Sequence, residues 1–441
     1  MAGYSSYKRS KIDWLGDIPS HWVTMPLRYT ALGKGCSFID GDWIESKNIS
    51  SEGIKYLTTG NVGPGYYKEQ GSGYISEETF KELNCTDVLP GDLLISRLNE
   101  PIARTCIVPN LDTRIVTAVD NVIYRPNTNI CDKRYVCYWL NNAKLTEHAN
   151  VIARGATMHR ISRTMLGHLP VLLPPVEEQH AIANYLDVEC KKIDDLIEKE
   201  EKRVQLIEEA KLSIITKVIT KGIDADKEFV NSGLDWIGKI PSDWALWKTS
   251  HLFTGIGSGT TPKSGDSSYY DDEGHYWLQT GDLNDGHITD TSKKVTDKAV
   301  SEKNLRFYPV NSLVIAMYGA TIGKLGILEI ETSTNQACCV LPPSKKILPM
   351  FAFYHFMAAK QYLINQSAGG GQPNISQDII RRHKIALPST IDEQQDIVDY
   401  ISEKTIKYDT ALKKANILIK TLKEYKLSLI TEVVTGKRKV C

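Results

Sequence analysis

The sequence predicts a mixed α/β (α+β) protein in which two similar globular domains are separated by two long helices. Three observations support this fold class. Two motifs occur twice, with about half of the chain between the copies. Each half opens with short β-branched runs between turn residues, and each half closes with a long polar segment that has helical periodicity. A duplicated chain of this kind predicts approximate twofold symmetry.

A motif with two tryptophans opens both halves of the chain. Residues 13–22 read D-W-L-G-D-I-P-S-H-W, and residues 235–244 read D-W-I-G-K-I-P-S-D-W. A second stretch, K-L-S-[IL]-I-T, occurs at residues 211–216 and 426–431. The copies of these motifs start 222 and 215 residues apart. We interpret the Gly-x-Ile-Pro core as a rigid turn that the tryptophans attach to the domain, which is a structural role.

The globular part of each half contains both strand-like and helix-like segments. Residues 91–96 and 311–316 are short apolar runs next to glycine or asparagine, as expected for buried strands. Residues 134–148 and 350–365 have helical patterns. We therefore expect four consecutive segments, which are a first domain, a first long helix, a second domain and a second long helix, at residues 1–175, 176–222, 223–388 and 389–441.

Each long helix carries an apolar stripe whose members alternate by four and three residues, which is the a/d pattern of a coiled coil. The first stripe contains Ile193, Ile197, Glu200, Val204, Ile207, Lys211, Ile214 and Val218. The second contains Tyr408, Leu412, Ala415, Ile419, Leu422, Lys426, Leu429 and Val433, each displaced by 215 residues. Prolines and acidic residues precede the helices and glycines follow them, so each spans roughly 43 residues, or about 65 Å.

The short linker between the first long helix and the second domain predicts the direction of packing. Residues 221–234 reach at most about 50 Å when fully extended. The second domain must therefore begin near the end of the first helix, and the second helix must run back along it. We expect an antiparallel coiled coil, and the polar members of the stripe are candidates for fixing its register.

Composition and the lack of catalytic motifs favour a binding protein of a reducing compartment, which we take to be the cytoplasm. The net charge is zero, with 53 basic and 53 acidic residues. No apolar run approaches the roughly 18 residues of a membrane span, and no secretory signal is evident. The nine cysteines have no C-x-x-C pair or zinc-like spacing, so we expect neither a disulfide framework nor a metal site. No phosphate loop, nucleophile elbow or other catalytic motif is present in the sequence.

The chain resembles the specificity subunits of type I restriction–modification systems over nearly its whole length. The resemblance depends on the tryptophan motif that opens each half, on G-D-L-L-I-S at 91–96, on Y-G-A-T-I-G-K-L-G at 318–326, and on L-P…E-Q at 173–179 and 387–394. It implies two target-recognition domains, held apart by an antiparallel helical pair, that each read one half of a bipartite site in double-stranded DNA. It implies no cofactor on this chain and no catalytic residues.

The resemblance also implies partners. We expect two modification subunits, which would bind S-adenosylmethionine, methylate adenine and dock on the helical region. Restriction subunits that use ATP and Mg²⁺ would join them. Because a chain with no net charge has no basic footprint, we expect partner subunits to supply much of the phosphate neutralisation.

The two domains differ in sequence, so we expect two different half-sites and an asymmetric target. Residues 40–43, D-G-D-W, have no obvious counterpart near T-T-P-K at 260–263. Residues 96–101, S-R-L-N-E-P, depart from the glycine-rich pattern that the second domain keeps at 318–323. We expect this departure to weaken the correspondence between these loops.

Base readout requires donors and acceptors on exposed loops. The candidates in the first domain lie in two loops, and they are Arg97, Asn99, Arg104, Thr105, Arg154, Thr157, His159 and Arg160. Those in the second domain lie in three, and they are Thr260, Thr261, Lys263, Tyr318, Thr321, Lys324, Gln372 and Asn374. An arginine bound to O6 and N7 of guanine is the commonest specific contact, so we expect Arg97 and Arg104 each to set one base.

Three alternatives compete with a DNA-reading subunit. The chain could be a non-catalytic coiled-coil scaffold that binds protein only, and would then retain no DNA in a sequence-selective manner. It could be the specificity module of another restriction type. It could also be a nuclease built from scattered carboxylates, which would cleave DNA without any partner.

Overall fold

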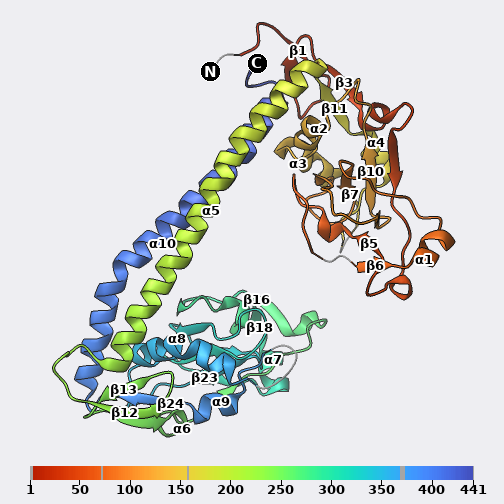
Figure 1. The fold of residues 1–441 in the computed structure, drawn as a ribbon. Helices are drawn as coiled ribbons and strands as arrows, with labels where there is room; N and C mark the ends of the chain where they lie inside the picture. Colours follow the sequence, from red (N-terminus) through yellow and green to blue (C-terminus); the bar gives the residue numbers. More distant parts are fainter. Residues whose placement is uncertain (1–2, 71–72, 156–157, 368–372, 441) are drawn as a thin grey trace. The chain divides into compact units, whose positions relative to one another are not determined.

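The computed structural model describes residues 3–70, 73–155, 158–367 and 373–440 (Figure 1). It divides into two compact units, which are described separately below. Unit 1 comprises Met1–Glu201 and Ile417–Cys441, and unit 2 comprises Lys202–Asn416. The two long helices, α5 (Val176–Lys221) and α10 (Ile391–Val434), each contribute residues to both units. In the described part of the chain, no helix is both long and apolar enough to cross a membrane.

The globular part of unit 1 is a mixed α/β domain. Its strands are β1 (Tyr7–Arg9), β2 (Asp17–Pro19), β3 (Val23–Pro26), β4 (Ser37–Asp40), β5 (Ile54–Leu57), β6 (Gly73–Ile75), β7 (Leu93–Ser96), β8 (Thr105–Ile107), β9 (Ile115–Thr117), β10 (Asn121–Arg125) and β11 (Pro170–Leu173). Its helices are α1 (Glu77–Glu82), α2 (Lys133–Leu140), α3 (Ala143–Ile152) and α4 (Arg163–His168). The central sheet has the order β4-β10-β7-β8, and a smaller sheet has the order β6-β5-β9.

Unit 2 repeats this plan. Its strands are β12 (Phe229–Leu234), β13 (Gly238–Pro241), β14 (Ala245–Lys248), β15 (Gly257–Ser258), β16 (Tyr270–Leu278), β17 (Gly286–Ile288), β18 (Lys294–Val295), β19 (Phe307–Tyr308), β20 (Leu313–Ala316), β21 (Leu325–Leu328), β22 (Thr332–Thr334), β23 (Cys338–Leu341) and β24 (Lys384–Leu387). Its shorter helices are α6 (Thr249–Leu252), α7 (Asp297–Lys303), α8 (Pro349–Asn365) and α9 (Gln377–Arg382).

The sheets of the two units correspond strand by strand. The order β15-β23-β20-β21 in unit 2 matches β4-β10-β7-β8 in unit 1, with β17 added at one edge. The parallel pair β16 and β22 matches the parallel pair β5 and β9. The strands β7 and β20 are buried along their whole length, as the apolar runs at 91–96 and 311–316 predict, and β23 is buried as well. The mixed α/β fold class and the duplication are thus confirmed.

The long helices are buried along the stripe that the sequence predicts. In α5, Ile193, Ile197 and Val218 are buried, and the intervening stripe positions are half-buried. In α10, Ile419, Leu429 and Val433 are buried, while Tyr408, Leu412 and Leu422 are half-buried. Most side chains between the stripe positions are exposed. This narrow band is typical of a two-helix seam, since a helix packed on its own domain buries a wider face.

Ion pairs across the seam show that the helices are antiparallel. In unit 1, Lys426 contacts Asp194 at 2.6 Å and Lys423 contacts Glu201 at 2.9 Å. The residue numbers therefore rise along α5 while those of the contacting residues fall along α10. In unit 2, Lys211 contacts Asp409 at 2.5 Å. The pair Lys211–Asp409 is the repeat equivalent of the pair Lys426–Asp194, because Lys211 corresponds to Lys426 and Asp409 to Asp194. The two polar stripe lysines therefore make equivalent contacts that fix one register.

The tryptophan motif joins each globular part to both long helices. In unit 1, Trp22 is fully buried and its indole N–H donates to Glu178 in the first turn of α5 at 3.1 Å. The same motif packs on Gly436 just beyond α10, where a Cβ atom would collide with Pro19. In unit 2, Trp244 donates to Glu393 in the first turn of α10 at 3.0 Å, and its ring lies against Gly222 at the end of α5.

The glutamine of each E-Q pair anchors a second loop. The buried Gln179 side chain accepts from the backbone N–H of Asp132 and donates to the carbonyls of Ile130 and Pro174. Gln394 makes the equivalent contacts with Leu348 and Lys346 in unit 2. The L-P…E-Q signature is therefore a structural joint. Its acidic residue, Glu178 or Glu393, accepts the tryptophan hydrogen bond in addition to complementing the helix dipole.

Replacing Trp22 by phenylalanine is expected to lower the free energy of unfolding by about 1–3 kcal/mol, because the half-buried Glu178 carboxylate loses a donor. A double-mutant cycle with Glu178→Ala, which removes the acceptor, should give a coupling energy between the two side chains when measured by urea unfolding. The neighbouring exposed Glu177→Ala is the matched control and should show no coupling. Additive costs of Trp22→Phe and Glu178→Ala would contradict this joint.

Unit 2 also buries two histidines against each other. The Nε2 atoms of His355 and His383 lie 3.0 Å apart, and Trp236 of the second tryptophan motif stacks on His383. Burial lowers the pKa of His383 to about 4 and that of His355 well below its ordinary value. Both imidazoles are therefore neutral in the folded chain, since one of them must accept the proton of the other.

The histidine pair makes the stability of unit 2 depend on pH. Because the folded pKa values lie below the unfolded value of about 6.5, the unfolded chain binds more protons, and stability is lost as the pH falls from 6.5 toward 4. For His383 alone the loss approaches about 3 kcal/mol at pH 4. Urea unfolding at pH 7 and pH 4.5 should show a smaller difference for His383→Phe than for the wild type. The exposed His251→Gln should leave that difference unchanged, and an equal difference in all three would contradict the assignment.

Candidate nucleic-acid interface

The structure brings the two candidate loops of unit 1 together at one edge of the central sheet. The loop at 97–104 joins β7 to β8, and the loop at 153–162 joins α3 to α4. The N–H of Asn99 donates to the carbonyl of His159 at 2.9 Å, and the N–H of Ile161 donates to the carbonyl of Arg97 at 3.0 Å. Two loops that are about 55 residues apart in sequence thus form one surface.

Arg97 does not present its guanidinium to solvent, which contradicts the expectation that it lies exposed on its loop. Its side chain is 6% exposed and lies 3.2 Å from Asp40 and 3.9 Å from Asp120. It also donates to the carbonyls of Val119 and Ile161. Burial lowers the pKa of Arg97 and the two carboxylates oppose this shift, so the group stays charged inside the domain.

Arg104 and Thr105 are likewise occupied inside unit 1. Arg104 donates to five backbone carbonyl oxygens at 2.8–3.4 Å, which ties the 97–104 loop to the segment around residues 59–62. Thr105 is fully buried in β8, and its hydroxyl donates to the carbonyl of Ala103. These two side chains therefore do not lie free on an exposed loop as expected, since their hydrogen-bonding groups are engaged by backbone carbonyls of unit 1.

The other described candidates of unit 1 are exposed. Asn99 has a positive φ of 61° and lies at the tip of its loop. His159 contacts Glu100 at 2.6 Å, and Arg160 contacts Asp120 at 2.7 Å. Arg154 is exposed and its backbone pairs with that of Arg160. Thr157 lies outside the described residues.

Unit 2 builds the same surface from its own residues. Tyr318 forms a backbone bridge with Asn374, and the N–H of Ile375 donates to the carbonyl of Met317 at 2.8 Å. Asn374 is exposed, whereas Tyr318, Thr321 and Lys324 are half-buried. Gln372 lies outside the described residues.

The loop of unit 2 at 260–263 flanks this surface. Thr260, Thr261 and Lys263 are exposed, and the Thr261 hydroxyl donates to the side chain of Gln336 in the turn before β23. The carbonyl of Thr260 accepts from the indole of Trp277 at 3.1 Å. The Thr260 carbonyl and the Thr261 hydroxyl thus hold this loop, and the side chains of Thr260 and Lys263 are exposed on it.

The stretches at 40–43 and 260–263 occupy overlapping places, although their sequences suggest no correspondence. Gly41 follows β4 and packs against the carbonyl of Thr117 at the end of β9. Gly259 follows β15 and packs against the carbonyl of Thr334 at the end of β22. A side chain on either glycine would collide with that carbonyl, so a single shared glycine marks the position. Asp42 and Trp43 therefore correspond to Thr260 and Thr261.

The loops at 97–104 and 317–324 also correspond closely, which corrects the expectation that their different sequences weaken this match. Ser96 and Arg104 pair through their backbones as Ala316 and Lys324 do. The positive φ angles occur at Asn99 and Ala103 in unit 1, and at Gly319 and Gly323 in unit 2. Asparagine and alanine thus adopt in unit 1 the left-handed conformation that glycine adopts in unit 2.

The structure adds four residues that the sequence did not single out. Trp43 is 67% exposed, which is unusual for a tryptophan outside a binding surface. Asp40 and Asp120 both form ion pairs with Arg97, and they also pair with Arg163 and Arg160, respectively. The sequence contains no signal for these ion pairs, because the residues are distant in the chain. The indole of Trp43 was detectable only as an aromatic residue in a polar turn.

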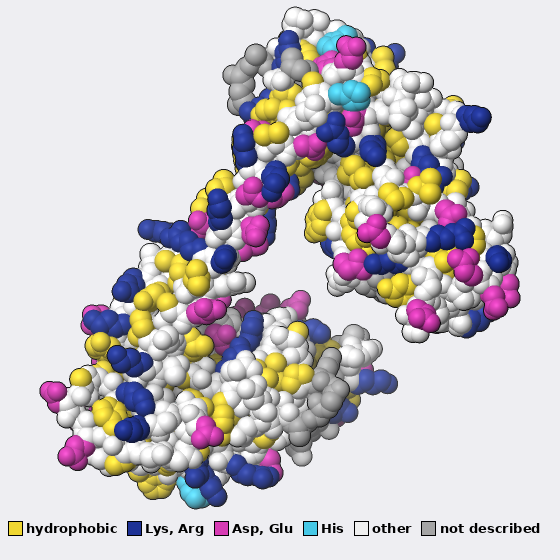
Figure 2. Space-filling model, in the orientation of Figure 1, with side chains coloured by type: hydrophobic (Ala, Val, Ile, Leu, Met, Phe, Trp, Pro, Cys, Tyr) yellow, Lys and Arg dark blue, Asp and Glu magenta, His cyan; other side chains and the backbone are white. Residues whose placement is uncertain are grey.

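The charges on the surface are mixed. On the face shown in Figure 2, Lys and Arg side chains are interspersed with Asp and Glu over both units. This agrees with the net charge of zero. A surface of this kind gives little non-specific attraction to phosphates, so specific contacts and partners must contribute more.

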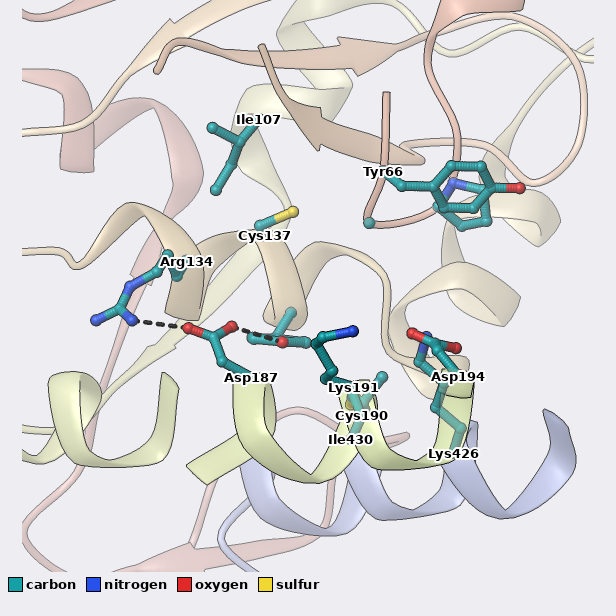
Figure 3. Close-up of a pocket in the computed structure, with 13 residues that line it drawn as sticks. Tyr66, Ile107, Arg134, Cys137, Asp187, Cys190, Lys191, Asp194, Lys426 and Ile430 are labelled. Atoms are coloured by element: carbon teal, nitrogen blue, oxygen red, sulfur yellow. Dashed lines mark hydrogen bonds and ion pairs between the residues drawn. The ribbon is translucent and has the colours of Figure 1, made fainter. Parts of the chain in front are cut away.

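A cavity of about 530 Å³ lies in unit 1 between α2, α5 and α10 (Figure 3). Its charged groups are all engaged in ion pairs, because Arg134 contacts Asp187, Lys426 contacts Asp194, and Lys191 contacts Asp195 just outside the cavity. The hydroxyl of Tyr138 also donates to Asp187. Burial raises the pKa of the Cys190 thiol to about 11, so that it is not a nucleophile at neutral pH. Within the described ranges, no cluster of three or more His, Cys, Asp or Glu side chains could hold a metal ion.

Comparison with known proteins identifies the family. The profile described as the type I restriction modification DNA specificity domain matches residues 35–209 and 241–424. The chain belongs to this family. It is 27% identical over 337 residues to the putative type I restriction enzyme MjaX specificity subunit of Methanocaldococcus jannaschii, covering 74% of each chain. It is 18% identical over 445 residues to the EcoKI specificity subunit of Escherichia coli K12, covering 96% of this chain and 90% of that one.

A solved structure supports the fold of this specificity subunit. A chain from a type I restriction–modification system, solved in a study of complex assembly and conformational transition, matches with a TM-score of 0.63. The sequences are 15% identical, and the match covers 95% of this chain and 98% of the other. Both copies of the specificity domain in the profile match contain one loop pair described above, so the loop pairs belong to the part of the chain that defines the family.

The contacts of Arg104 predict a structural role that can be tested. Arg104→Ala is expected to lower the free energy of unfolding by about 1–3 kcal/mol and to speed hydrogen exchange of the 97–104 amides, because five carbonyls lose a donor. Arg104→Lys should lose less, since Lys324 occupies the same position in unit 2. The exposed Arg154→Ala is the control and should leave both measurements unchanged. Unchanged stability of Arg104→Ala would contradict this role.

Proposed function

We propose that this specificity subunit reads a bipartite and asymmetric target in double-stranded DNA, with each unit reading one half. The observation that carries this proposal is the duplicated loop pair. Both units position two loops with the same backbone hydrogen bonds, yet the exposed side chains differ, such as Arg160 in unit 1 and Asn374 in unit 2. A constant scaffold with different donors and acceptors is what two different half-sites require.

The proposal assigns the chemistry to partner subunits. Modification subunits carrying S-adenosylmethionine would dock on α5 and α10 and methylate adenine, and restriction subunits using ATP and Mg²⁺ would cleave. The chain itself would be non-catalytic. In its favour, the acidic and basic groups that line the cavity in unit 1 are all engaged in ion pairs, and the pKa of the cavity thiol Cys190 is raised. The name of the family, DNA specificity domain, supports the same division of labour.

Methylation profiling tests this proposal. The chain is co-expressed with its modification subunits, and methylated positions are mapped across the genome of the host. We expect one motif with two dissimilar halves separated by a spacer of fixed length. Asn374→Ala should relax one half only, and Asn99→Ala the other half only. A palindromic motif, or methylation that does not require this chain, would contradict the proposal, as would cleavage of DNA by the isolated chain with Mg²⁺.

A further inference from the structure

A network of five charged side chains lies beneath the candidate surface of unit 1. Arg97 lies between Asp40 and Asp120, at 3.2 and 3.9 Å. Asp120 also contacts Arg160 at 2.7 Å, and Asp40 also contacts Arg163 at 3.5 Å. The Arg97 side chain is 6% exposed, whereas those of Arg160 and Arg163 are 47% and 46% exposed. The network thus runs from a buried arginine through two aspartates to two arginines at the surface.

Unit 2 has no charge at any of the five corresponding positions. The N–H of Arg97 donates to the carbonyl of Asp120 as that of Met317 donates to Ala337, so Arg97 corresponds to Met317. In the paired strands, Asp40 lies opposite Val122 as Ser258 lies opposite Cys339.

Arg160 and Arg163 have equally clear counterparts. The bridge between Leu98 and Arg160 matches the bridge between Tyr318 and Asn374. Ser162 caps α4 and Ser376 caps α9, which makes Arg163 the counterpart of Gln377 at the first position of each helix. The five residues of unit 2 are therefore Met317, Ser258, Ala337, Asn374 and Gln377.

The fold does not need the network, because unit 2 builds the same backbone with a buried methionine in place of Arg97. A buried ion pair contributes little to stability once desolvation is counted, and apolar replacements are often equally stable. This network is also imperfectly satisfied. The Nε atom of Arg97 and the Oδ1 atoms of Asp40 and Asp120 are buried within ion-pair distance but lack hydrogen-bond geometry. Its presence in unit 1 alone therefore requires an explanation other than folding.

We infer that Arg160 and Arg163 read guanine in the half-site of unit 1, and that Asp120, Asp40 and the buried Arg97 position them. This inference rests on the proposed function. An arginine fork matches O6 and N7 of guanine, whereas asparagine matches N6 and N7 of adenine. Asn374, the counterpart of Arg160, accordingly selects adenine in the half-site of unit 2. The two halves of the target differ in base composition at the positions that these side chains reach.

The carboxylates explain how two exposed arginines become selective. An arginine without a partner samples many rotamers and binds phosphate as readily as a base. The contact of Asp120 uses Nη2 of Arg160, and the contact of Asp40 uses Nη1 of Arg163, so each fork is held while most of its five N–H donors remain directed elsewhere. The side-chain entropy lost on binding DNA is smaller for a fork that is already held.

Methylation by the complete complex on a DNA library with randomised half-sites tests this inference. Arg160→Ala and Arg163→Ala should each abolish the preference for guanine at one position of one half-site, with about a ten- to hundredfold loss of methylation at the original site. The other half-site should keep its preferences. A uniform weakening for all sequences with a shallower salt dependence would mean phosphate contacts only, and would overturn the inference.

Two further variants separate positioning from folding. The triple variant Arg97→Met, Asp40→Ser, Asp120→Ala copies unit 2 without leaving a buried carboxylate unpaired, so its thermal unfolding should match the wild type, while the guanine preference relaxes. Asp120→Asn keeps the shape of the side chain and should relax the preference at the position set by Arg160. Arg114→Ala is the matched control, because Arg114 pairs with Asp87 at 2.6 Å on the same unit but outside the loop pair. It should leave the base preferences unchanged.

Different results would overturn the proposed function and this inference. A wild-type complex that methylates without sequence preference would overturn the proposed function. A wild-type complex that is selective, but whose unit 1 half-site lacks guanine or keeps it in both Arg160→Ala and Arg163→Ala, would overturn this inference alone. Loss of the guanine preference in these variants, with Arg114→Ala unchanged, would support it.

Discussion

A hydrogen bond between a buried indole and a glutamate in the first helical turn organises each unit. Trp22 donates to Glu178 at the start of α5, and the same motif packs on Gly436 beyond the end of α10. In unit 2 the roles of the helices are exchanged, because Trp244 donates to Glu393 at the start of α10 and lies on Gly222 at the end of α5. One motif can contact the start of one helix and the end of the other only if the helices are antiparallel. The same contacts therefore attach each recognition domain to the helices and require the helices to be antiparallel.

Much of the fold could be predicted because its signals are local or repeated. The a/d stripe of α5 and α10 depends on spacing alone, and side chains such as Ile193, Ile197 and Val433 are buried along it. The candidate surface was harder to predict. The sequence located the loops, but residue type does not reveal whether a polar group faces outward. Arg97 and Arg104 were expected to read bases because arginine does so most often, yet backbone carbonyls and buried carboxylates occupy their donors. Long-range partners such as Asp40 and Asp120 decide this, and they leave no local pattern.

The correspondence of the loops was hidden for a related reason. A left-handed backbone position favours glycine, and unit 2 has Gly319 and Gly323 at the two such positions. Unit 1 has Asn99 and Ala103 there, so a comparison of residue types suggests that the loops differ while the backbone is the same. The surrounding hydrogen bonds, including those of Arg104, hold the strained alanine conformation in place. Backbone geometry is thus maintained by different means in the two units.

The duplicated chain provides an internal comparison that a single domain lacks. A charged residue in one unit can be judged against its counterpart on an equivalent backbone in the other. Met317 shows that the position of Arg97 tolerates an apolar side chain. The fold therefore does not require a buried guanidinium with two carboxylates, whose desolvation costs free energy. The charges accompany the exposed arginines of the loop surface and are absent where those arginines are replaced by amides. Because the scaffold is common to both units, the difference between them lies in what each surface contacts.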